Sequence, residues 1–300
     1  MKILITGANG QVGHALAQRL ADLGEVIALD RQGADLSKPD SIVAVLDAHR
    51  PDWIINAAAY TAVDKAESEQ DLANEINAKA PGVMAAWAEK HGARLVHYST
   101  DYVFDGQLDR PYREDDATAP LNVYGATKLA GEQAILATKA QAWVLRTTWV
   151  FATHGANFLK TMLRLGQERD ALSVVNDQIG APTSASWIAE VTARLIEAES
   201  APATGIYHLA AAGSTHWQGY AQFVLSEAQR LGVSLKVHSE QVAGIPSSAY
   251  PTPAQRPMNS RLNSDALMDA LGLSAPDWRT DVAQVTAELV GQAKSSSKGI

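Results

Sequence analysis

Tyr124 and Lys128 lie four positions apart at the start of an expected helix. Side chains at this spacing share one face of a helix, so the phenol and the ammonium group can point into one site. An unperturbed tyrosine has a pKa of about 10, and a nearby cation lowers that pKa because it favours the phenolate. The pair therefore predicts an acid–base group suited to a carbonyl or an alcohol. The same spacing is also typical of a solvent-exposed helix with one aromatic anchor.

A polar strand end precedes this pair in the sequence. An expected strand over 95–98 runs into Thr100 and Asp101. Thr100 would donate a hydrogen bond to the same substrate oxygen as Tyr124 and sharpen its polarisation. Asp101 would hold a neighbouring sugar hydroxyl or tune the local charge, and Lys128 would also bind the ribose of a nicotinamide cofactor. Together these residues make a chance match of the Tyr-x-x-x-Lys spacing a poor explanation.

A glycine-rich segment directly follows the first expected strand. Gly7, Gly10 and Gly13 lie three positions apart, which differs from the G-x-G-x-x-G dinucleotide fingerprint. Glycine permits a tight turn, lets a pyrophosphate approach the backbone and lets the next helix pack near the sheet. The helix N-terminus would then offer free N–H groups and a partial positive charge to the phosphates. Glycine is common in any turn, but its position between a strand and a helix favours a cofactor site.

Residues near the second and third expected strand ends fit the rest of a dinucleotide. Asp30 lies where a carboxylate can accept both ribose hydroxyls of NAD, and we favour this role over that of a turn residue. For Arg31, contact with a 2′-phosphate and exposure to solvent are equally supported. Asp35 and Leu36 could reach the adenine. Small residues at 57–59 would let a cofactor lie against the backbone, and close helix–sheet packing is the alternative explanation for each alanine.

The first half of the chain alternates short β-rich runs with longer helical segments. The expected strands are continuous apolar runs, as in strands buried on both faces of a parallel sheet, at 2–5, 25–29, 53–56, 95–98 and 142–146. Apolar residues at helical spacing predict helices over 12–23, 41–49, 71–90 and 124–138. This alternation predicts an α/β fold with a doubly wound parallel sheet of the Rossmann type. We expect the dinucleotide-binding domain at 1–151 and a smaller α+β region, mainly substrate-binding, at 152–300, part of which returns to the first sheet.

Composition excludes several classes of protein. The chain has 300 residues, no cysteine, 46% apolar residues and a formal net charge of −8. Without cysteine there is no disulfide scaffold, thiolate nucleophile or iron–sulfur cluster. The acidic balance argues against nucleic acid or an anionic membrane as the main partner. No apolar stretch is long enough to span a bilayer, and the N-terminal one is too short for a signal peptide, so we expect a soluble, cytoplasmic protein.

Several motifs along the chain occur together in one known family. The most specific is the Ser-Thr-Asp-Tyr-Val-Phe run at 99–104, and others lie at 10–13, 62–67, 120–125, 146–151, 180–183 and 256–260. With the glycine-rich start and the Tyr124–Lys128 pair, they resemble the extended short-chain dehydrogenase/reductase family. Within it, the chain is most similar to the group of dTDP-4-dehydrorhamnose reductases. The resemblance covers nearly the whole chain.

The resemblance implies three groups of site residues. The catalytic triad would be Thr100, Tyr124 and Lys128. The residues that contact NADH or NADPH would be Gly7, Gly10, Gln11, Val12, Gly13, Asp30, Asp35, Leu36, Ala58, Ala59, Tyr60, Tyr98, Tyr124 and Lys128. The residues that contact the sugar would be Thr100, Asp101 and Trp149, and a core position is the alternative for the tryptophan.

The substrate implied by the resemblance is a nucleotide-sugar. Its diphosphate needs donors from the second region, and Arg256, Asn259 and Gln178 are candidates because a guanidinium fork matches phosphate oxygens. A surface turn is the alternative for the loop around Gln178. Some family members are described as dimerising through a magnesium ion held by glutamates. Ala15 and Ser186 stand where we align two of these glutamates, so we predict no metal, and a homodimer is left open.

The resemblance implies reduction of the C4 carbonyl of dTDP-4-dehydro-β-L-rhamnose to dTDP-β-L-rhamnose by NADH or NADPH, with Tyr124 as proton donor. A sugar-nucleotide epimerase or dehydratase of the same fold is one alternative. Dehydratases carry a carboxylate pair, and the tyrosine after Asp101 disfavours that activity. A non-catalytic regulatory subunit, similar to the beta subunit of methionine adenosyltransferase, is the other alternative, and the intact Thr100, Tyr124 and Lys128 argue against it.

Overall fold

A six-stranded parallel sheet forms the centre of the larger part of the molecule. The computed structural model describes residues 1–297. The strand order is β10-β5-β4-β3-β1-β2, and every neighbouring pair is parallel. The strands are β1 (Lys2–Thr6), β2 (Glu25–Leu29), β3 (Trp53–Asn56), β4 (Arg94–Thr100), β5 (Gln141–Thr147) and β10 (Gly205–His208). The first five lie where apolar runs predicted strands, and the α/β doubly wound fold is confirmed.

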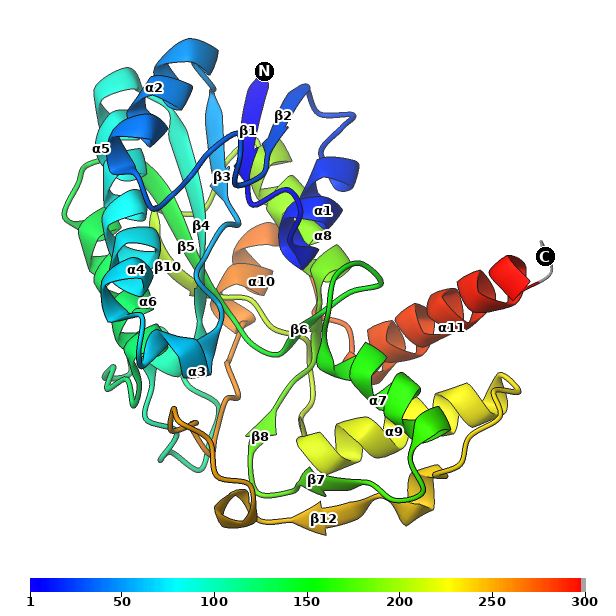
Figure 1. The fold of residues 1–300 in the computed structure, drawn as a ribbon. Coiled ribbons are helices and arrows are strands. Elements are labelled where there is room, and N and C mark those ends of the chain that lie inside the picture. The colour runs from blue at the N-terminus through cyan, green and yellow to red at the C-terminus, as the bar shows by residue number, and fades with distance from the viewer. Residues whose placement is uncertain (298–300) are drawn as a thin grey trace.

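Helices cover both faces of this sheet (Figure 1). One face carries α1 (Gln11–Arg19), α8 (Ala185–Glu197) and α10 (Asp265–Leu271), which share an apolar core with Ile3 and Ile5. The opposite face carries α2 (Pro39–His49), α5 (Ala80–His91) and α6 (Val123–Leu136), whose core includes Leu4, Ile54 and Leu95. Successive strand residues point to opposite faces. Each strand therefore carries a mostly apolar run, because it contributes to both cores.

The predicted helix over 71–90 is divided in the structure. A π-helical turn (Glu75–Lys79) separates α4 (Gln70–Asn74) from α5. The turn lies where α6 comes close, since a Cβ at Gly131 would overlap the carbonyl oxygen of Asn77. The buried Asn77 side chain hydrogen-bonds both backbone groups of Tyr60. The turn therefore fixes the segment after β3 beside α6.

A smaller α+β part is built from the second half of the chain (Figure 1). Its helices α7 (Phe158–Glu168), α9 (Trp217–Arg230) and α11 (Trp278–Ser297) surround a separate apolar core. Its short strand pairs are β6 (Val150–Phe151) with β9 (Thr183–Ser184), β7 (Ser173–Val175) with β12 (Ala243–Ile245), and β8 (Ile179–Gly180) with β11 (Thr215–His216). The remaining short helices are α3 (Val63–Ala66) and the 3₁₀ turns Asp101–Val103, Ser239–Gln241 and Ser247–Ala249.

The second half of the chain also contributes to the large sheet. β10 pairs with β5 at the edge, and α8 lies beside α1, where Glu190 accepts a hydrogen bond from Arg19 at 2.5 Å. A domain boundary at residue 151 stays a prediction. β10 and α8 come after this residue in the chain but pack with the first 151 residues. Within residues 1–297, no helix combines the length and apolarity needed to cross a membrane.

Candidate active site

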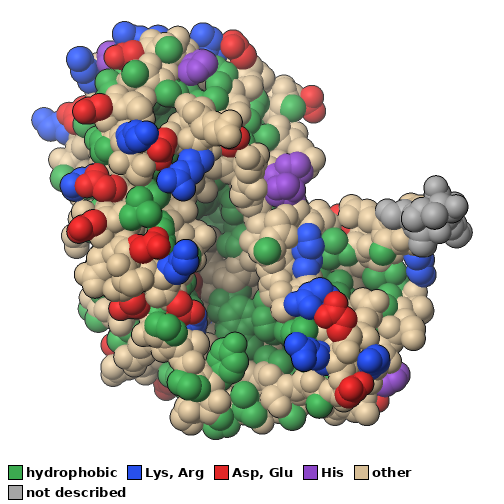
Figure 2. All heavy atoms as spheres, viewed as in Figure 1, with side chains coloured by type: hydrophobic (Ala, Val, Ile, Leu, Met, Phe, Trp, Pro, Cys, Tyr) green, Lys and Arg blue, Asp and Glu red, His purple; other side chains and the backbone are tan. Residues whose placement is uncertain are grey.

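A cavity of about 1190 Å³ lies between the parallel sheet and the smaller part. Figure 2 shows a hollow with many hydrophobic side chains on its floor. Residues of both parts line the cavity, among them Asp64, Tyr102, Gln178, Trp217, Tyr250 and Arg256. The carboxyl ends of parallel strands meet at one edge of a sheet, and ligands bind there in open α/β folds. The cavity is large enough for a ligand of nucleotide-sugar size.

The glycine-rich segment forms a tight turn between β1 and α1. Gly7 has a φ of 76°, and a Cβ there would lie 2.7 Å from Ala58 N. A Cβ at Gly13 would overlap the Gly7 carbonyl oxygen, so both positions require glycine. α1 begins at Gln11 with Gly10 as its N-cap and no side-chain cap, which leaves its first N–H groups and its positive end for an anion. This turn fits the pyrophosphate of a dinucleotide.

Asp30 lies beside this turn and closes the loop after β2. Its Oδ1 accepts hydrogen bonds from the N–H groups of Gln32 (2.9 Å) and Gly33 (3.1 Å), and its Oδ2 accepts one from the Asn9 amide (3.2 Å). Oδ2 is therefore close to the glycine turn and keeps acceptor capacity for a ribose hydroxyl. The ribose contact of Asp30 stays a prediction that this position supports.

The predicted adenine contacts have protein partners of their own. Asp35 accepts hydrogen bonds from Ser37 N and Oγ at 3.1 and 2.7 Å, and its carboxylate lies 3.7 Å from Arg31. The Ser37 hydrogen bonds, aided by Arg31, lower the pKa of Asp35. Leu36 is only 4% exposed and packs in the same core as Ile42. Its side chain therefore offers little surface to a base.

The structure brings only some of the predicted channel residues together. Ala58 and Ala59 follow β3, and Ala58 lies against the glycine turn. Tyr60 is held in the same segment, with its hydroxyl donating to Glu69 at 2.5 Å. Tyr98 differs, because its phenol packs on the face of the sheet that α1 and α8 cover. There its hydroxyl lies 2.7 Å from the Thr192 hydroxyl of α8. Tyr98 therefore meets the catalytic residues through its backbone carbonyl and not through its ring.

Tyr124 lies in the first turn of α6, close to the end of β4. Burial raises the pKa of Tyr124 to about 12, while a hydrogen bond with Thr100 lowers it and the Asp101 charge raises it. The expectation that Lys128 makes this phenol more acidic is wrong, because the Lys128 ammonium is turned toward β4. The phenol therefore keeps its proton at neutral pH.

Lys128 is 1% exposed and reaches the backbone of β4. Its Nζ donates to the Tyr98 carbonyl oxygen at 2.6 Å and lies 3.0 Å from His97 Nε2. Burial lowers the pKa of Lys128 to about 8, and the Glu132 carboxylate opposes this shift. An ammonium has three N–H donors, so one remains for a ligand.

Thr100 and Asp101 follow one another at the end of β4, and both are buried. The Thr100 hydroxyl donates to Asp101 Oδ1 at 3.1 Å and accepts from Tyr102 N at 3.2 Å. Burial raises the pKa of Asp101 to about 6. Within residues 1–297, Asp101 Oδ2 has no hydrogen-bond partner. A buried acceptor of this kind fits a sugar hydroxyl.

Two of the three predicted diphosphate donors line the cavity. The Arg256 guanidinium binds Asp64 Oδ1 and Oδ2 at 3.0 and 2.8 Å, and with five N–H donors it retains capacity for a phosphate. Gln178 donates to Ser247 Oγ at 3.0 Å and accepts from the Trp217 indole at 3.2 Å. Both side chains are thus held in place at the cavity wall by protein partners.

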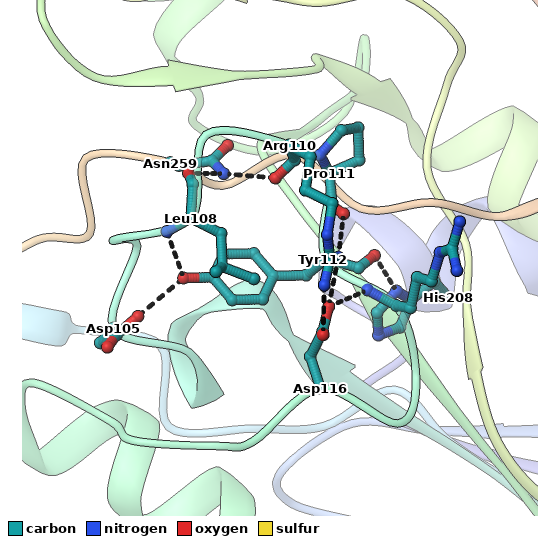
Figure 3. Close-up of polar contacts among 9 residues, drawn as sticks. Asp105, Leu108, Arg110, Pro111, Tyr112, Asp116, His208 and Asn259 are labelled. Atoms are coloured by element: carbon teal, nitrogen blue, oxygen red, sulfur yellow. Dashed lines mark hydrogen bonds and ion pairs between the residues drawn. The ribbon is translucent and has the colours of Figure 1, made fainter.

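The third predicted diphosphate donor, Asn259, lies outside the cavity wall. Figure 3 shows its amide turned to the 105–116 loop, where Nδ2 donates to the carbonyl oxygens of Leu108 and Arg110 at 2.7 and 2.8 Å. Its Oδ1 accepts from Arg261 N at 3.1 Å. These bonds occupy the donors and the acceptor of the amide, so the geometry does not favour a phosphate contact. Asn259 instead fixes a loop whose first residues line the cavity.

Trp149 is partly buried and does not itself line the cavity. It has a φ of 44°, which is uncommon for a residue with a Cβ. Its ring stacks on Trp217 with centroids 3.6 Å apart, and a Cβ at Gly180 would lie 2.5 Å from the ring. The stack therefore supports Trp217, which does line the cavity. A direct sugar contact of Trp149 stays a prediction.

Sequence reasoning missed several lining residues. Asp64 and Tyr102 lie within motifs that carried the family resemblance, but no chemistry was assigned to them. The Tyr102 ring meets the Tyr124 ring edge-on at a centroid distance of 5.6 Å. Trp217 and Phe158, which also line the cavity, have no sequence signal beyond their apolar character.

The positions considered for a metal-bridged dimer lie on two neighbouring helices, Ala15 on α1 and Ser186 on α8. Ser186 donates a hydrogen bond to Ser184 Oγ at 3.0 Å. Among residues 1–297, no three His, Cys, Asp or Glu side chains are grouped so that they could hold a metal ion.

The fold and the site define a Rossmann-type oxidoreductase of the short-chain dehydrogenase/reductase class. Residues 1–290 match the family described as the RmlD substrate binding domain. The chain is 48% identical over 295 residues to the dTDP-4-dehydrorhamnose reductase of Escherichia coli (strain K12), covering 96% of this chain and 98% of that protein. It is 46% identical to the reductase of Burkholderia thailandensis, covering 97% and 100%. The chain belongs to the dTDP-4-dehydrorhamnose reductase family.

Solved structures agree with this assignment. The dTDP-4-dehydrorhamnose reductase of Bacillus anthracis, solved in complex with NADP, has a TM-score of 0.88 at 35% identity, covering 96% of this chain and 99% of that chain. The Clostridium acetobutylicum reductase also has a TM-score of 0.88, at 36% identity with the same coverage. The predicted enzyme class is confirmed, and these relatives give no support to an epimerase or a non-catalytic subunit.

Proposed function

We propose that this enzyme reduces the C4 carbonyl of dTDP-4-dehydro-β-L-rhamnose to give dTDP-β-L-rhamnose, with NADH or NADPH as reductant. The substrate is inferred from the family, and the chemistry is inferred from the residues of the site. The single observation that carries it is the placement of Tyr124, in the first turn of α6, beside Thr100 and Asp101 at the carboxyl end of β4.

The residues around the glycine turn would hold the cofactor. The uncapped start of α1 would bind the pyrophosphate, Asp30 would accept from the adenosine ribose, and the free N–H of Lys128 would bind the second ribose. When bound, the reduced nicotinamide supplies the hydride for the C4 carbon. A Cβ at Gly7 or Gly13 would overlap backbone atoms of or beside this turn, so the turn stays open to a pyrophosphate only with glycine at both positions. This supports the placement of the cofactor.

Tyr124 would donate the proton to the C4 oxygen as negative charge develops there. Reduction requires a phenol that is protonated before the reaction, and the pKa of about 12 for Tyr124 meets this requirement. Thr100 would hydrogen-bond the same oxygen, and the unpaired Oδ2 of Asp101 would accept from a neighbouring sugar hydroxyl. Arg256 and Gln178 would face the diphosphate from the cavity wall.

The test is a panel of keto-sugar nucleotides assayed with NADH and with NADPH. We expect oxidation of the reduced cofactor with dTDP-4-dehydro-β-L-rhamnose and formation of dTDP-β-L-rhamnose in equal amount. A chain that interconverts epimers without added reductant, or one that is inactive with every member of the panel, would contradict the proposal.

A further inference from the structure

Three polar side chains lie next to one another inside the apolar sheet. Thr6 on β1 is the register partner of Asn56 on β3, and Asn56 is the partner of His97 on β4. Each of the three is 1% exposed. Register partners point to the same face of a sheet, here the face covered by α6, which carries Lys128. A row of polar groups at such a position costs free energy unless each group is hydrogen-bonded.

The row is continuous with the Lys128 side chain. Lys128 Nζ lies 3.0 Å from His97 Nε2, His97 Nδ1 lies 2.9 Å from the Asn56 amide nitrogen, and Asn56 Oδ1 accepts from Thr6 Oγ1 at 2.7 Å. Four buried side chains thus form one hydrogen-bonded chain across three strands and a helix. None of the proposed catalytic steps uses the three residues on the strands.

The donors in this chain can be counted. An ammonium group only donates, so His97 Nε2 must accept from Lys128, and a neutral ring then carries its hydrogen on Nδ1. Nδ1–H needs an acceptor, which Asn56 provides when its amide is rotated by 180° to present Oδ1 to His97 and Nδ2 to Thr6. With the amide nitrogen facing Nδ1, the ring hydrogen sits on Nε2 instead, and Lys128 must be a neutral amine. The tautomer of His97 therefore reports the charge of Lys128.

The charges around Lys128 favour the ammonium arrangement. Burial lowers the pKa of Lys128 to about 8, which leaves the ammonium as the main form at neutral pH. Glu132, one helical turn further on, raises this pKa and is itself bound by Arg146 at 2.6 and 2.9 Å. Burial, and then the Lys128 charge, hold the pKa of His97 well below its usual value, so the imidazole stays a neutral acceptor. Tyr124, one turn before Lys128 on α6, is itself influenced by the Asp101 charge and not by Lys128.

We propose that His97 is a positioning residue for the reaction, which holds Lys128 as an ammonium through Nε2 and is itself fixed in the Nδ1–H tautomer by Asn56 and Thr6. The inference rests on the proposed function. His97 and the Tyr98 carbonyl take two of the three ammonium hydrogens. The third then remains for the cofactor ribose, and the ammonium charge that would bind this ribose is retained.

The tautomer is tested directly in the full-length wild-type chain by ¹⁵N NMR of labelled histidine. We expect a neutral His97 with a protonated Nδ1 from about pH 6 to about pH 7.5. His208 is an internal reference, because its Nδ1 lies 3.1 Å from the Tyr112 carbonyl oxygen, which can only accept, so a neutral ring must be the Nδ1–H tautomer there too. The signals are assigned with His97→Gln and His208→Gln. A protonated Nε2 on His97 in this range would overturn the proposal whether or not the enzyme reduces the expected sugar.

Two substitutions then distinguish a positioning role of His97 in the reaction from a purely structural role. In His97→Leu, which removes the acceptor, we expect kcat to fall at least about tenfold with the KM of the nucleotide-sugar changed less than about twofold. The ammonium loses a partner, so the decline of kcat at alkaline pH should move to lower pH than in the wild type. His97→Gln keeps an acceptor and should restore most of kcat and the position of the decline. A His97→Leu enzyme with the wild-type kcat and pH profile would refute the positioning role, whereas a wild type inactive with the whole panel would refute the reductase function alone.

Discussion

The Asp64 carboxylate binds the Arg256 guanidinium through both oxygens, at 3.0 and 2.8 Å, across 192 positions of the chain. Asp64 lies in α3 beside the large sheet, and both residues line the cavity. Two parallel hydrogen bonds fix the plane of a guanidinium as well as its position. The pair therefore joins a segment near the carboxyl edge of the sheet to the C-terminal segment, at the place where a diphosphate would be bound.

Replacing Arg256 by Lys should weaken binding of the nucleotide-sugar. An ammonium cannot form the two-point contact with Asp64 and also present a planar edge to phosphate. We expect the KM of the substrate to rise about tenfold, which corresponds to about 1.4 kcal/mol, with kcat changed less than about threefold. Arg110→Lys is the matched control, because Arg110 binds Asp116 in the same two-point manner on the surface. Equal effects of the two substitutions on KM would contradict a phosphate role for Arg256.

Replacing Tyr124 by Phe should remove the proton donor and leave the binding site in place. Loss of a general acid typically lowers the rate by about 10²–10⁴-fold. We expect kcat to fall by this amount, measured as oxidation of NADH or NADPH, with a smaller effect on KM. Tyr207→Phe is the control, since that hydroxyl donates to the Ala203 carbonyl at 2.9 Å at the far edge of the sheet. If Tyr124→Phe kept more than about a tenth of kcat, another group would have to supply the proton.

Replacing Gly13 by Ala should disturb cofactor binding. The added Cβ would overlap the Gly7 carbonyl oxygen, and backbone atoms on both sides would have to move. We expect the affinity for NADH and NADPH, measured by fluorescence titration, to fall at least about tenfold, because the turn would no longer follow the pyrophosphate. The control, Gly291→Ala in α11, meets nothing within 4 Å and should stabilise the helix by about 0.5–1 kcal/mol. Unchanged affinity in Gly13→Ala would argue against the predicted phosphate site.

Asp101 should make the wild type less stable as the pH rises. Burial raises its pKa from an ordinary value of 3.8 to about 6, so the folded state binds the carboxyl proton more tightly than the unfolded state. The resulting stability is present below about pH 4 and is lost as the pH rises through about 6. Asp101→Asn should therefore be more stable than the wild type by about 3 kcal/mol at about pH 8 in urea unfolding, and lose this advantage at about pH 4.

Asp116 provides a control of opposite sign for this experiment. Its hydrogen bonds from Arg110 lower its pKa to about 2, so its ionised form stabilises the folded state at neutral pH. Asp116→Asn should be less stable than the wild type at about pH 8, and the difference should shrink as the pH falls through about 2. If Asp101→Asn were no more stable than the wild type at about pH 8 while Asp116→Asn behaved as expected, the ionised carboxylate of Asp101 would not destabilise the folded state.

The strands of the large sheet could be predicted because they are buried on both faces. In one strand of this kind, Trp53–Asn56, every residue but the last is apolar, and β3 begins and ends where the predicted strand does. The π-helical turn at Glu75–Lys79 could not be predicted in this way. It depends on the close approach of Gly131 on α6 to the Asn77 carbonyl, which the local sequence does not encode.

The residues of the site could be predicted better than their electrostatics. Helical spacing correctly placed Tyr124 and Lys128 in one helix, but the ammonium group is directed at His97 and the Tyr98 carbonyl by a strand 30 positions away in sequence. The direction of the Tyr124 pKa shift depends on this contact and on burial. Neither can be deduced from the four-residue spacing of Tyr124 and Lys128. The same limit applies to Asn259, whose amide is occupied by a loop that packs on it only in three dimensions.

The pairing of β10 with β5 has a consequence for recombination between related genes. β5 receives its outer neighbour from residues 205–208, after the chain has passed through α7 of the smaller part. A crossover at residue 151 would join β5 to a foreign edge strand, and a fragment ending there would expose the unpaired backbone of a strand buried on both faces, a template for aggregation. A functional chimera must therefore inherit the segment from α8 through β10 together with the first 151 residues.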